Sequence, residues 1–298
     1  MSNFLKPIDE QVVVITGASS GIGLATAIQA ASHGAKLVLA ARSEDVLADI
    51  VDELVAAGAE AIYVAADVAE RDQVERIAEA AISRFGRIDT WVNDAGVSIY
   101  GRLEEVDEED SRRLFDTNFW GIVNGSLAAL PHLRANGGAL INLGSEVSDA
   151  VVPLQGMYSA SKHAVKGFTD ALRVEVAEID KAPVSITLIQ PTAVNTPYPQ
   201  HAKNYMDHEP KLPTPMIDPQ RVAEAILHAA TDPERSIKVG ALSKLNTTME
   251  KLFPALAEKM SAKQAGRQQY AEPPRNPEGG LYRPSGEGEI HGRDTTRH

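Results

Sequence analysis

Tyr158 and Lys162 are the residues of this sequence whose types and spacing point to proton transfer. They stand four positions apart in a stretch with helical spacing, so we expect both side chains on one helix face. A free tyrosine has a pKa of about 10, and a cation about 4 Å away at an effective dielectric of about 20 contributes about 4 kcal/mol. That energy equals about three pKa units, so we expect Lys162 to bring the phenol toward neutrality. The pair alone is weak evidence, because this spacing also arises by chance.

A glycine-rich turn, TGASSGIG at residues 16–23, directly follows an apolar run and opens a helical pattern. Glycines let the backbone turn tightly and approach a pyrophosphate, and the start of a helix offers free N–H groups to an anion. This context matches the dinucleotide-binding fingerprint. The alternative is a turn that only packs a strand against a helix. We expect cofactor contacts from Gly17, Ser19, Ser20, Gly21, Ile22 and Gly23.

The end of the second apolar run carries information on the type of dinucleotide. NAD-selective proteins place an acidic residue near this point for the ribose 2′-hydroxyl, whereas an arginine accommodates a 2′-phosphate. This sequence has Ala41 followed by Arg42 and Ser43, so NADP(H) is predicted over NAD(H). If Arg42 is instead solvated at the start of the next helix, NAD(H) is the alternative. Asp67 and Val68 follow the third run and are expected beside the adenine, although Asp67 could also cap a helix.

Seven apolar runs rich in β-branched residues alternate with longer segments of helical spacing. Near-continuous apolar runs are typical of parallel strands that are buried on both faces. The runs are 12–15, 36–39, 61–64, 88–92, 139–143, 184–189 and 236–239. The helical segments include 43–57, 70–85, 107–130 and 156–180. This alternation predicts an α/β fold, a Rossmann-like doubly wound parallel sheet of about seven strands with helices on both faces.

Further polar residues follow the strands predicted at 88–92 and 139–143, or lie on the helices beside them. Asn93-Asp94-Ala95-Gly96 follows the first of these strands, Asn118 lies in the next helical segment, and Ser145 stands thirteen residues before Tyr158. Because ligands bind beyond the carboxyl ends of strands in such sheets, these residues are expected to converge with the glycine turn. In order and spacing, the whole set resembles the classical short-chain dehydrogenase/reductase family.

The resemblance implies an oxidoreductase that transfers hydride between a nicotinamide and a ketone, an aldehyde or a secondary alcohol, and Arg42 makes NADP(H) the predicted cofactor. In this family Tyr158 would exchange the proton with the substrate oxygen, and Lys162 would lower its pKa and bind the nicotinamide ribose. Ser145 would polarise the carbonyl, and Asn118 would hold a water in a proton relay toward Lys162. Ser145 and Asn118 could instead only cap or bond backbone. Further cofactor contacts are implied for Asn93, Ala95, Gly96, Pro191, Val194 and Thr196, and for Tyr158 and Lys162 themselves.

Two rival functions remain open at this stage. One is an NAD-preferring alcohol dehydrogenase, in which Arg42 does not contact the cofactor. The other is a non-catalytic NADP(H)-binding sensor that keeps the glycine turn and signals through its tail. The presence of all four predicted catalytic residues, Tyr158, Lys162, Ser145 and Asn118, favours an enzyme.

The sequence departs from the family pattern at two positions. Asp94 replaces the second asparagine of the segment after the fourth strand, and its carboxylate can accept hydrogen bonds but cannot donate them. Thr192 follows Pro191 where the family usually has glycine, and a β-branched residue resists a positive φ angle. We therefore expect a differently shaped wall at this part of the site.

A long connection at 192–218, rich in Pro, Tyr and His, is predicted to be a lid over the substrate. The substrate pocket is expected to include Val147, Gln155, Met157, Tyr198 and Tyr205, with His201 and Met206 as further lid residues. Their apolar and aromatic character favours a bulky hydrophobic carbonyl compound. The alternative is that these residues only pack the lid.

The chain is divided by composition into a lead-in (1–10), a catalytic domain (11–240), a helical extension (241–270) and a Pro- and Gly-rich tail (271–298). Pro254 is expected to kink or end the helix of the extension, which we expect to dock on its own subunit rather than on a membrane or a partner helix. The tail is predicted to be flexible or to cross to a neighbouring subunit. The family resemblance implies a homodimer or homotetramer formed through the helices at 107–130 and 156–180.

Charge and composition exclude several other classes. A net charge of −12, from 29 basic and 41 acidic residues without a concentrated basic patch, argues against nucleic acid as a partner. The absence of cysteine excludes disulfides and thiol catalysis, and no histidine is placed as a convincing metal ligand. The sequence has neither 18 consecutive apolar residues nor an apolar run near its start, so we expect a cytoplasmic protein without a membrane partner.

Overall fold

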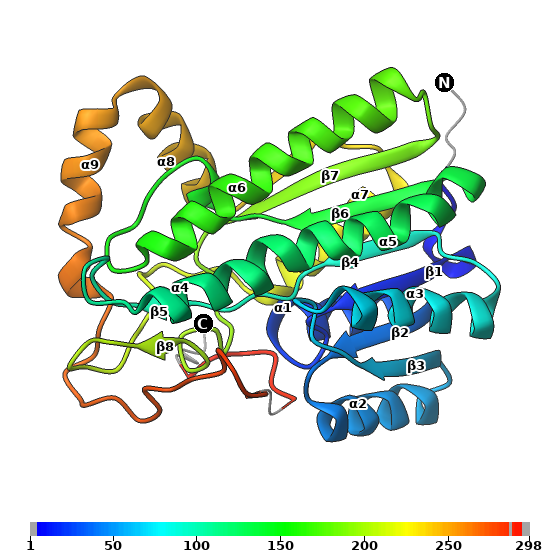
Figure 1. The fold of residues 1–298 in the computed structure, drawn as a ribbon, viewed down its shortest axis with the longest axis horizontal. Coiled ribbons are helices and arrows are strands. Elements are labelled where there is room, and N and C mark those ends of the chain that lie inside the picture. The colour runs from blue at the N-terminus through cyan, green and yellow to red at the C-terminus, as the bar shows by residue number, and fades with distance from the viewer. Residues whose placement is uncertain (1–4, 286–287, 294–298) are drawn as a thin grey trace.

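A parallel sheet of seven strands forms the centre of the molecule (Figure 1). The computed structural model describes residues 5–285 and 288–293. The strand order is β3-β2-β1-β4-β6-β7-β9, so the order reverses between β1 and β4. The strands are β1 (Val12–Thr16), β2 (Lys36–Ala41), β3 (Glu60–Ala65), β4 (Thr90–Asn93), β6 (Gly138–Leu143), β7 (Val184–Pro191) and β9 (Ser236–Val239). Each predicted apolar run coincides with one of these strands, which confirms the predicted Rossmann-like fold.

Both faces of the sheet are buried, which explains why the strands read as continuous apolar runs. Successive side chains point to opposite faces. Val13 and Ile15 of β1 therefore belong to one core cluster, and Val14 between them belongs to the other. Every residue of β1, β4, β6 and β7 is buried, whereas β3 at the edge is half-exposed.

Helices cover the two faces. The first core cluster contains side chains of α1 (Gly21–Ser32), α2 (Glu44–Ala56) and α7 (Pro219–Thr231). The second contains side chains of α3 (Arg71–Phe85), α5 (Gly121–Asn136) and the segment that begins with α6 (Gly156–Arg173). In Figure 1, α5 and α6 cross in front of the strands.

Each of the two long predicted helices contains a π-helical segment. The first comprises α4 (Glu108–Phe115), a π-helix at Asp116–Trp120 and α5; the second continues from α6 into a π-helix at Val174–Ile179. A π-helical turn inside an α-helix frequently marks a functional site. The first one contains Asn118, so the irregularity falls on a predicted catalytic residue.

The predicted lid lies over the carboxyl ends of the strands. Its short strand β8 (Lys203–Asn204) pairs with β5 (Ile99–Tyr100), which follows β4. Its two ends are joined by a bridge between Val194 and Ile217. The lid is therefore tied to the same sheet edge at which the predicted site residues converge.

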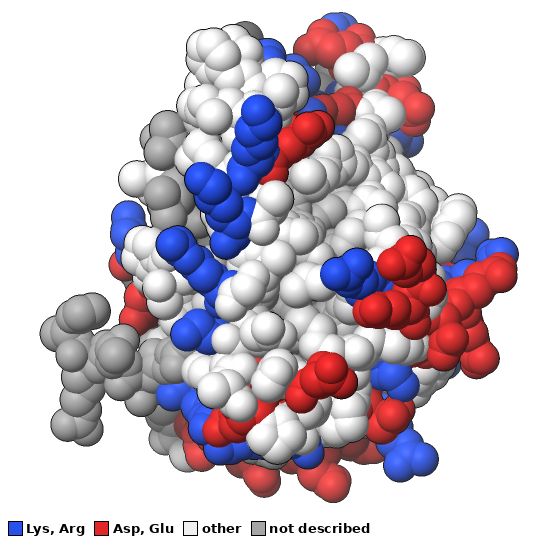
Figure 2. All heavy atoms as spheres, turned by 90° about the vertical axis from the view of Figure 1, so that its left-hand side faces the viewer, with Lys and Arg blue, Asp and Glu red and all other residues white. Residues whose placement is uncertain are grey.

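The helical extension consists of α8 (Ala241–Leu252) and α9 (Pro254–Ala262). Pro254 is the first residue of α9, where a proline is tolerated, so the predicted helix ends at Leu252 and restarts. Figure 2 shows the face of the molecule that lies on the left in Figure 1. Lys and Arg side chains form a broken line along one side of this face, and acidic side chains gather on the opposite side. Within the described part of the chain, no helix is both long and apolar enough to span a bilayer.

The described part of the tail packs on its own chain. A short 3-10 helix at Ala265–Arg267 precedes the tail, and the tail then returns past β8 toward α1 (Figure 1). Leu281 is fully buried there. Leu281, Ile290 and several backbone hydrogen bonds hold the described part of the tail on its own chain. The predicted flexibility or crossing to a neighbouring subunit stays a prediction.

Candidate active site

A cavity of about 330 Å³ runs along the carboxyl ends of the strands, within the usual size of ligand pockets. Its walls come from the segments that follow β1, β2, β3, β4, β6 and β7, as predicted for a doubly wound sheet. Most residues predicted to contact the cofactor line it. They are Gly17, Ser19, Ser20, Gly21, Ile22, Arg42, Ser43, Asp67, Val68, Ala95, Gly96, Tyr158, Lys162, Pro191, Val194 and Thr196.

The turn at Gly17 requires glycine. Its φ angle is +75°, and a Cβ atom there would lie 2.8 Å from the backbone of Ala95. The turn thus brings the start of α1 against the end of β4. Ser20, the residue before α1, makes no side-chain cap to the helix; the Gly21 amide donates to Glu289 O and the Gly23 amide to the Asp94 carboxylate.

Gly23 and Asp94 form a structural contact beneath this turn. The carboxylate of Asp94 accepts a hydrogen bond from the Gly23 amide, which gives the family departure at Asp94 a physical role. Gly23 does not line the cavity; a side chain there would overlap the Gly17 carbonyl oxygen. The predicted cofactor contact of Gly23 is therefore replaced by close packing of the turn. Burial raises the pKa of Asp94 to about 7, and nearby Lys162 opposes this shift.

Asn93 also lies away from the cavity, in contrast to the prediction. Its side-chain amide donates to Asn142 Oδ1 over 2.8 Å and to Ser126 Oγ over 3.3 Å. Its oxygen accepts from Trp91 Nε1 over 2.8 Å. Because the side chain is buried and fully bonded, it connects β4 with β6 and α5 instead of contacting a ligand.

Tyr158 lies in the first turn of α6, in hydrogen-bond contact with the side chains of Ser145 and Tyr198. Burial raises its pKa to about 12. Lys162 donates to Leu143 O over 2.7 Å, and its Nζ lies 5.7 Å from the Tyr158 ring centre. The expected lowering of the phenol pKa is therefore wrong for this structure, because withdrawal from water outweighs the hydrogen bonds with Ser145 and Tyr198 that lower it.

Lys162 is buried, and burial lowers its pKa to about 8, while Asp94 acts in the opposite direction. A buried ammonium is stable when acceptors surround it. Here the Leu143 carbonyl and the charge of Asp94 supply that environment. The lysine thus titrates much closer to neutral pH than a free lysine.

Asn118 holds two neighbouring segments together. Its Oδ1 accepts from the Val97 amide over 2.8 Å, and its Nδ2 donates to Val97 O over 2.9 Å. Nδ2 also bonds Ser161 Oγ over 3.2 Å, next to Lys162. The side chain is fully buried and does not line the cavity, so the structure shows the backbone-bonding alternative, and the water relay stays a prediction.

The lid end of the cavity contains three of the five predicted substrate residues, Val147, Gln155 and Tyr198, together with His201. Tyr198 donates to Gln155 Oε1 over 3.0 Å, and its ring centre lies 5.4 Å from that of Tyr158. This end of the cavity therefore leads directly to the predicted proton donor.

Met157, Tyr205 and Met206 do not line the cavity. Tyr205 donates to Asp110 Oδ2 over 2.6 Å, and Met157 and Tyr205 pack in a small apolar cluster with Leu281. For Met157 and Tyr205 the alternative prediction is favoured, because both pack between the lid and the tail. Successive residues of an α-helix are rotated by about 100°, so the Met157 side chain points away from the cavity that Tyr158 lines.

Several cavity residues were missed by sequence reasoning. Glu146 directly follows Ser145, and burial raises its pKa. Its Oε2 accepts from Asn246 Nδ2 over 3.0 Å, and it also bonds the Thr192 side chain. Thr192 adopts no positive φ angle, so this departure is accommodated without strain. The position of Glu146 beside a predicted catalytic serine was the signal that could have found it.

The helical extension supplies another missed wall. Met249 of α8 and Ala257, Met260 and Ser261 of α9 line the cavity beside the lid. Ser261 Oγ donates to Val151 O over 2.8 Å and joins α9 to the loop after β6. The helical spacing of the extension predicted a helix but carried no information on where it docks.

The comparisons with known proteins agree with this fold and cavity. The profile of the family described as short chain dehydrogenase matches residues 11–206. That range contains the glycine turn, Ser145, Tyr158 and Lys162. The chain belongs to the short-chain dehydrogenase family.

Individual relatives are similar over most of the chain. It is 48% identical over 283 residues to the uncharacterized oxidoreductase YxnA of Bacillus subtilis (strain 168), which covers 93% of this chain and 79% of that protein. An alcohol dehydrogenase from Thermococcus sibiricus complexed with 5-hydroxy-NADP has a TM-score of 0.67 and 31% identity, covering 77% of this chain and 94% of that one. A short chain dehydrogenase/reductase from Burkholderia phymatum in complex with NAD has a TM-score of 0.76 and 29% identity, covering 86% and 96%. The chain is an oxidoreductase of this family with a nicotinamide dinucleotide cofactor.

Proposed function

We propose that this chain is an NADP(H)-dependent oxidoreductase that interconverts a bulky apolar ketone and the corresponding secondary alcohol, or an aldehyde and the corresponding primary alcohol. One observation carries the proposal: Tyr158 in contact with Ser145, and Lys162 beside them, line the same cavity as the glycine turn. A dinucleotide held by that turn would lie in the cavity that Tyr158 also lines. When bound, the nicotinamide supplies or accepts the hydride.

The side chains at this end of the cavity provide the proton chemistry. Because its pKa is raised to about 12, the phenol of Tyr158 is protonated at neutral pH and can donate to a carbonyl oxygen. The Ser145 hydroxyl, in contact with the same phenol, orients and polarises that carbonyl. Lys162 adds a positive charge below pH of about 8 and binds the ribose of the cofactor. Asn118 donates to Ser161 Oγ, which in turn donates to Tyr158 O, so Asn118 supports the first turn of α6.

The cofactor preference for NADP(H) is proposed on the charges near the end of β2. Arg42 lines the cavity, and Ala41 leaves no acidic side chain for a ribose 2′-hydroxyl. Arg113, missed in the sequence, lies near Arg42 and pairs with Asp67. The negative charge of Asp67 is therefore balanced by its ion pair with Arg113, and Arg42 remains as the cation for a 2′-phosphate.

Replacing Arg42 with alanine tests this preference. A hydrogen bond to a charged group contributes about 1.5–3 kcal/mol, so the NADPH-to-NADH ratio of kcat/KM should fall roughly 10- to 150-fold. Arg71→Ala, at an exposed arginine of α3, is the matched control and should leave the ratio unchanged. An equal NADPH preference in Arg42→Ala would overturn the cofactor assignment.

The pH dependence of carbonyl reduction is predicted from the shifted pKa values of Tyr158 and Lys162. Tyr158 stays protonated well above neutral pH, so reduction should not fall because of its titration. Lys162 loses its charge as the pH rises through about 8, so kcat/KM for reduction should be flat below that pH and decline above it. A profile of kcat/KM against pH measures this, and Lys162→Arg, which keeps a cation, should lose the decline. A reduction rate that rises with pH would contradict the assignment.

We also propose that the chain forms a homodimer or homotetramer through α5 and α6. Large apolar side chains are exposed on or beside these helices: Trp120, Leu127, Val174 and Ile179. Exposed apolar patches of this kind are typical of protein contacts. The predicted oligomerisation helices and the exposed apolar residues therefore coincide.

A further inference from the structure

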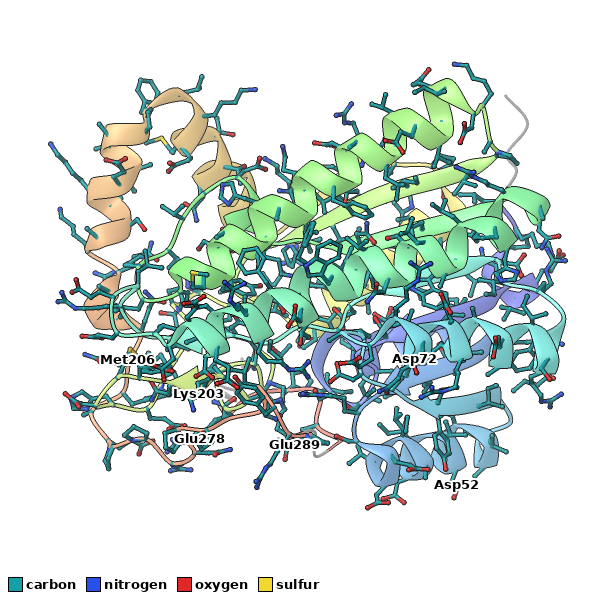
Figure 3. All side chains as sticks on the ribbon, viewed as in Figure 1. Asp52, Asp72, Lys203, Met206, Glu278 and Glu289 are labelled. Carbon is teal, nitrogen blue, oxygen red and sulfur yellow. The ribbon has the colours of Figure 1, made fainter. Side chains whose placement is uncertain are left out.

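Two described stretches of the tail, 276–285 and 288–292, are here together called the strap and lie at the outer side of the cofactor cavity. Three of its residues, Gly280, Pro284 and Ser285, line the cavity together with Arg42 and Asp67. Figure 3 labels Glu278 and Glu289 on the two halves of the strap, with Glu278 beside Lys203 of β8. The cavity therefore runs between the strand ends and the strap.

The strap is bonded directly to the proposed 2′-phosphate residue. Arg42 donates through Nη1 to Leu281 O over 3.1 Å and through Nη2 to Gly280 O. Arg113 donates through Nε to the same Leu281 oxygen over 3.2 Å. Two carbonyl groups of the strap thus fix the planar guanidinium of Arg42 beside a second arginine, and they use only part of its five donors.

The far half of the strap contacts the glycine turn and the opposite wall. The amide of Gly21, the first residue of α1, donates to Glu289 O over 2.9 Å. At Gly292, any side chain would overlap the carbonyl oxygen of Thr196, another cavity residue. The strap therefore spans from the Arg42 side to the Thr196 side.

Anchors between these points hold the strap down. Leu281 is fully buried in the cluster that includes Tyr158, and Tyr282 donates to Asp110 Oδ1 over 2.8 Å. Gly280 donates to His201 O over 2.7 Å, which ties the strap to the lid. Gly279 has a φ angle of +54°, and a side chain there would overlap Ala202 O, so this position requires glycine.

We propose that the strap is part of the dinucleotide site: it positions Arg42 for the cofactor phosphate, and a dinucleotide enters and leaves only when the strap detaches. This inference rests on the proposed function. It follows from the cavity lying beneath the strap and from strap bonds to Arg42 and Gly21, two residues that a dinucleotide would contact. Release of the cofactor should then be slow and should depend on strap anchors that never touch the cofactor.

Stopped-flow measurement of NADPH release from the full-length holoenzyme tests the strap. Gly279→Ala disturbs the anchor by its strained φ angle and its overlap with Ala202 O. We expect NADPH release at least about tenfold faster and a lower ratio of NADPH to NADH affinity, because Arg42 loses its position. Gly266→Ala, where an added Cβ meets nothing within 4 Å, is the matched control and should release NADPH at the wild-type rate.

Tyr282→Phe is the second variant and keeps the inference testable if Gly279→Ala does not fold. It removes one hydrogen bond of a half-exposed side chain outside the cavity, so the fold should survive. We expect a smaller acceleration of NADPH release, on the order of two- to fivefold, because a single hydrogen bond of the strap is lost. Bound NADPH should also slow backbone hydrogen exchange in the strap.

The possible outcomes distinguish a failure of the strap proposal from a failure of the proposed function. If NADPH binds but leaves the folded strap variants at the wild-type rate, the strap inference is overturned and the proposed function stands. If neither NADPH nor NADH binds the wild-type protein, both are overturned. Faster release in Gly279→Ala or Tyr282→Phe, with Gly266→Ala unchanged, supports the strap.

Discussion

Replacing Tyr158 with phenylalanine is expected to lower kcat/KM for carbonyl reduction by roughly 10²–10⁴-fold, the usual contribution of a positioned general acid. The substitution removes only the hydroxyl. The ring should keep its edge contact with Tyr198 and its place in the cluster with Leu281. NADPH affinity should therefore change little, and the loss should appear in kcat.

Steady-state kinetics with a fluorescence titration of NADPH measure both parts of this prediction. Tyr63→Phe, at an exposed tyrosine of β3, is the matched control and should keep wild-type activity. If Tyr158→Phe turned over a good substrate at the wild-type rate, Tyr158 would not be the proton donor. If it lost NADPH binding as well, the residue would act through the cofactor site instead.

The second large effect is expected at the glycine turn. Gly17→Ala places a Cβ 2.8 Å from the Ala95 backbone and holds a non-glycine residue at a φ angle of +75°. A strained residue of this kind costs about 1–3 kcal/mol. Relief by moving the turn would displace the start of α1 from the cofactor phosphates. We expect a lower free energy of unfolding and NADPH affinity reduced at least about tenfold.

Urea unfolding and NADPH titration check this result side by side. Gly167→Ala makes the same substitution in the exposed middle of α6, where an added Cβ meets nothing within 4 Å. It should leave NADPH affinity unchanged and stabilise the helix by up to about 1 kcal/mol. Equal affinities in the two variants would mean that the turn does not hold the cofactor.

The sheet could be predicted because its strands are buried on both faces. Continuous apolar runs such as 184–189 leave no alternative to a central parallel strand, and β7 occupies Val184–Pro191. Residues placed directly after such strands, such as Gly17 and Ser145, were located correctly, since the topology alone brings strand ends to one edge. Arg42 and Asp67 line the cavity for the same reason.

Side-chain direction was harder to predict than position. Asn93 is the last residue of β4, and its side chain turns into the core between β4 and β6. Asn118 lies in a π-helical turn, which no spacing rule reveals, and its amide is used by Val97 and Ser161. In both cases the family pattern marks a residue that holds neighbouring segments of the site together without lining the cavity.

Burial and long-range contacts explain the remaining differences. The predicted pKa of Tyr158 counted the Lys162 charge but not the loss of water around the phenol, which dominates. The strap could not be predicted, because its described anchors are backbone carbonyls, the Tyr282 hydroxyl and two isolated apolar residues, Leu281 and Ile290, without any periodic pattern. Composition gave no information on the packing of the described part of the tail against the core of the domain.

The most direct test of the account is deuterium transfer from NADPH carrying deuterium at C4 to a panel of bulky apolar ketones and aldehydes, followed by mass spectrometry of the products. The account predicts alcohols with one deuterium on the former carbonyl carbon, formed by the wild-type protein and almost absent with Tyr158→Phe. NADPH that binds but transfers no deuterium to any member of the panel would contradict the account and favour a non-catalytic sensor.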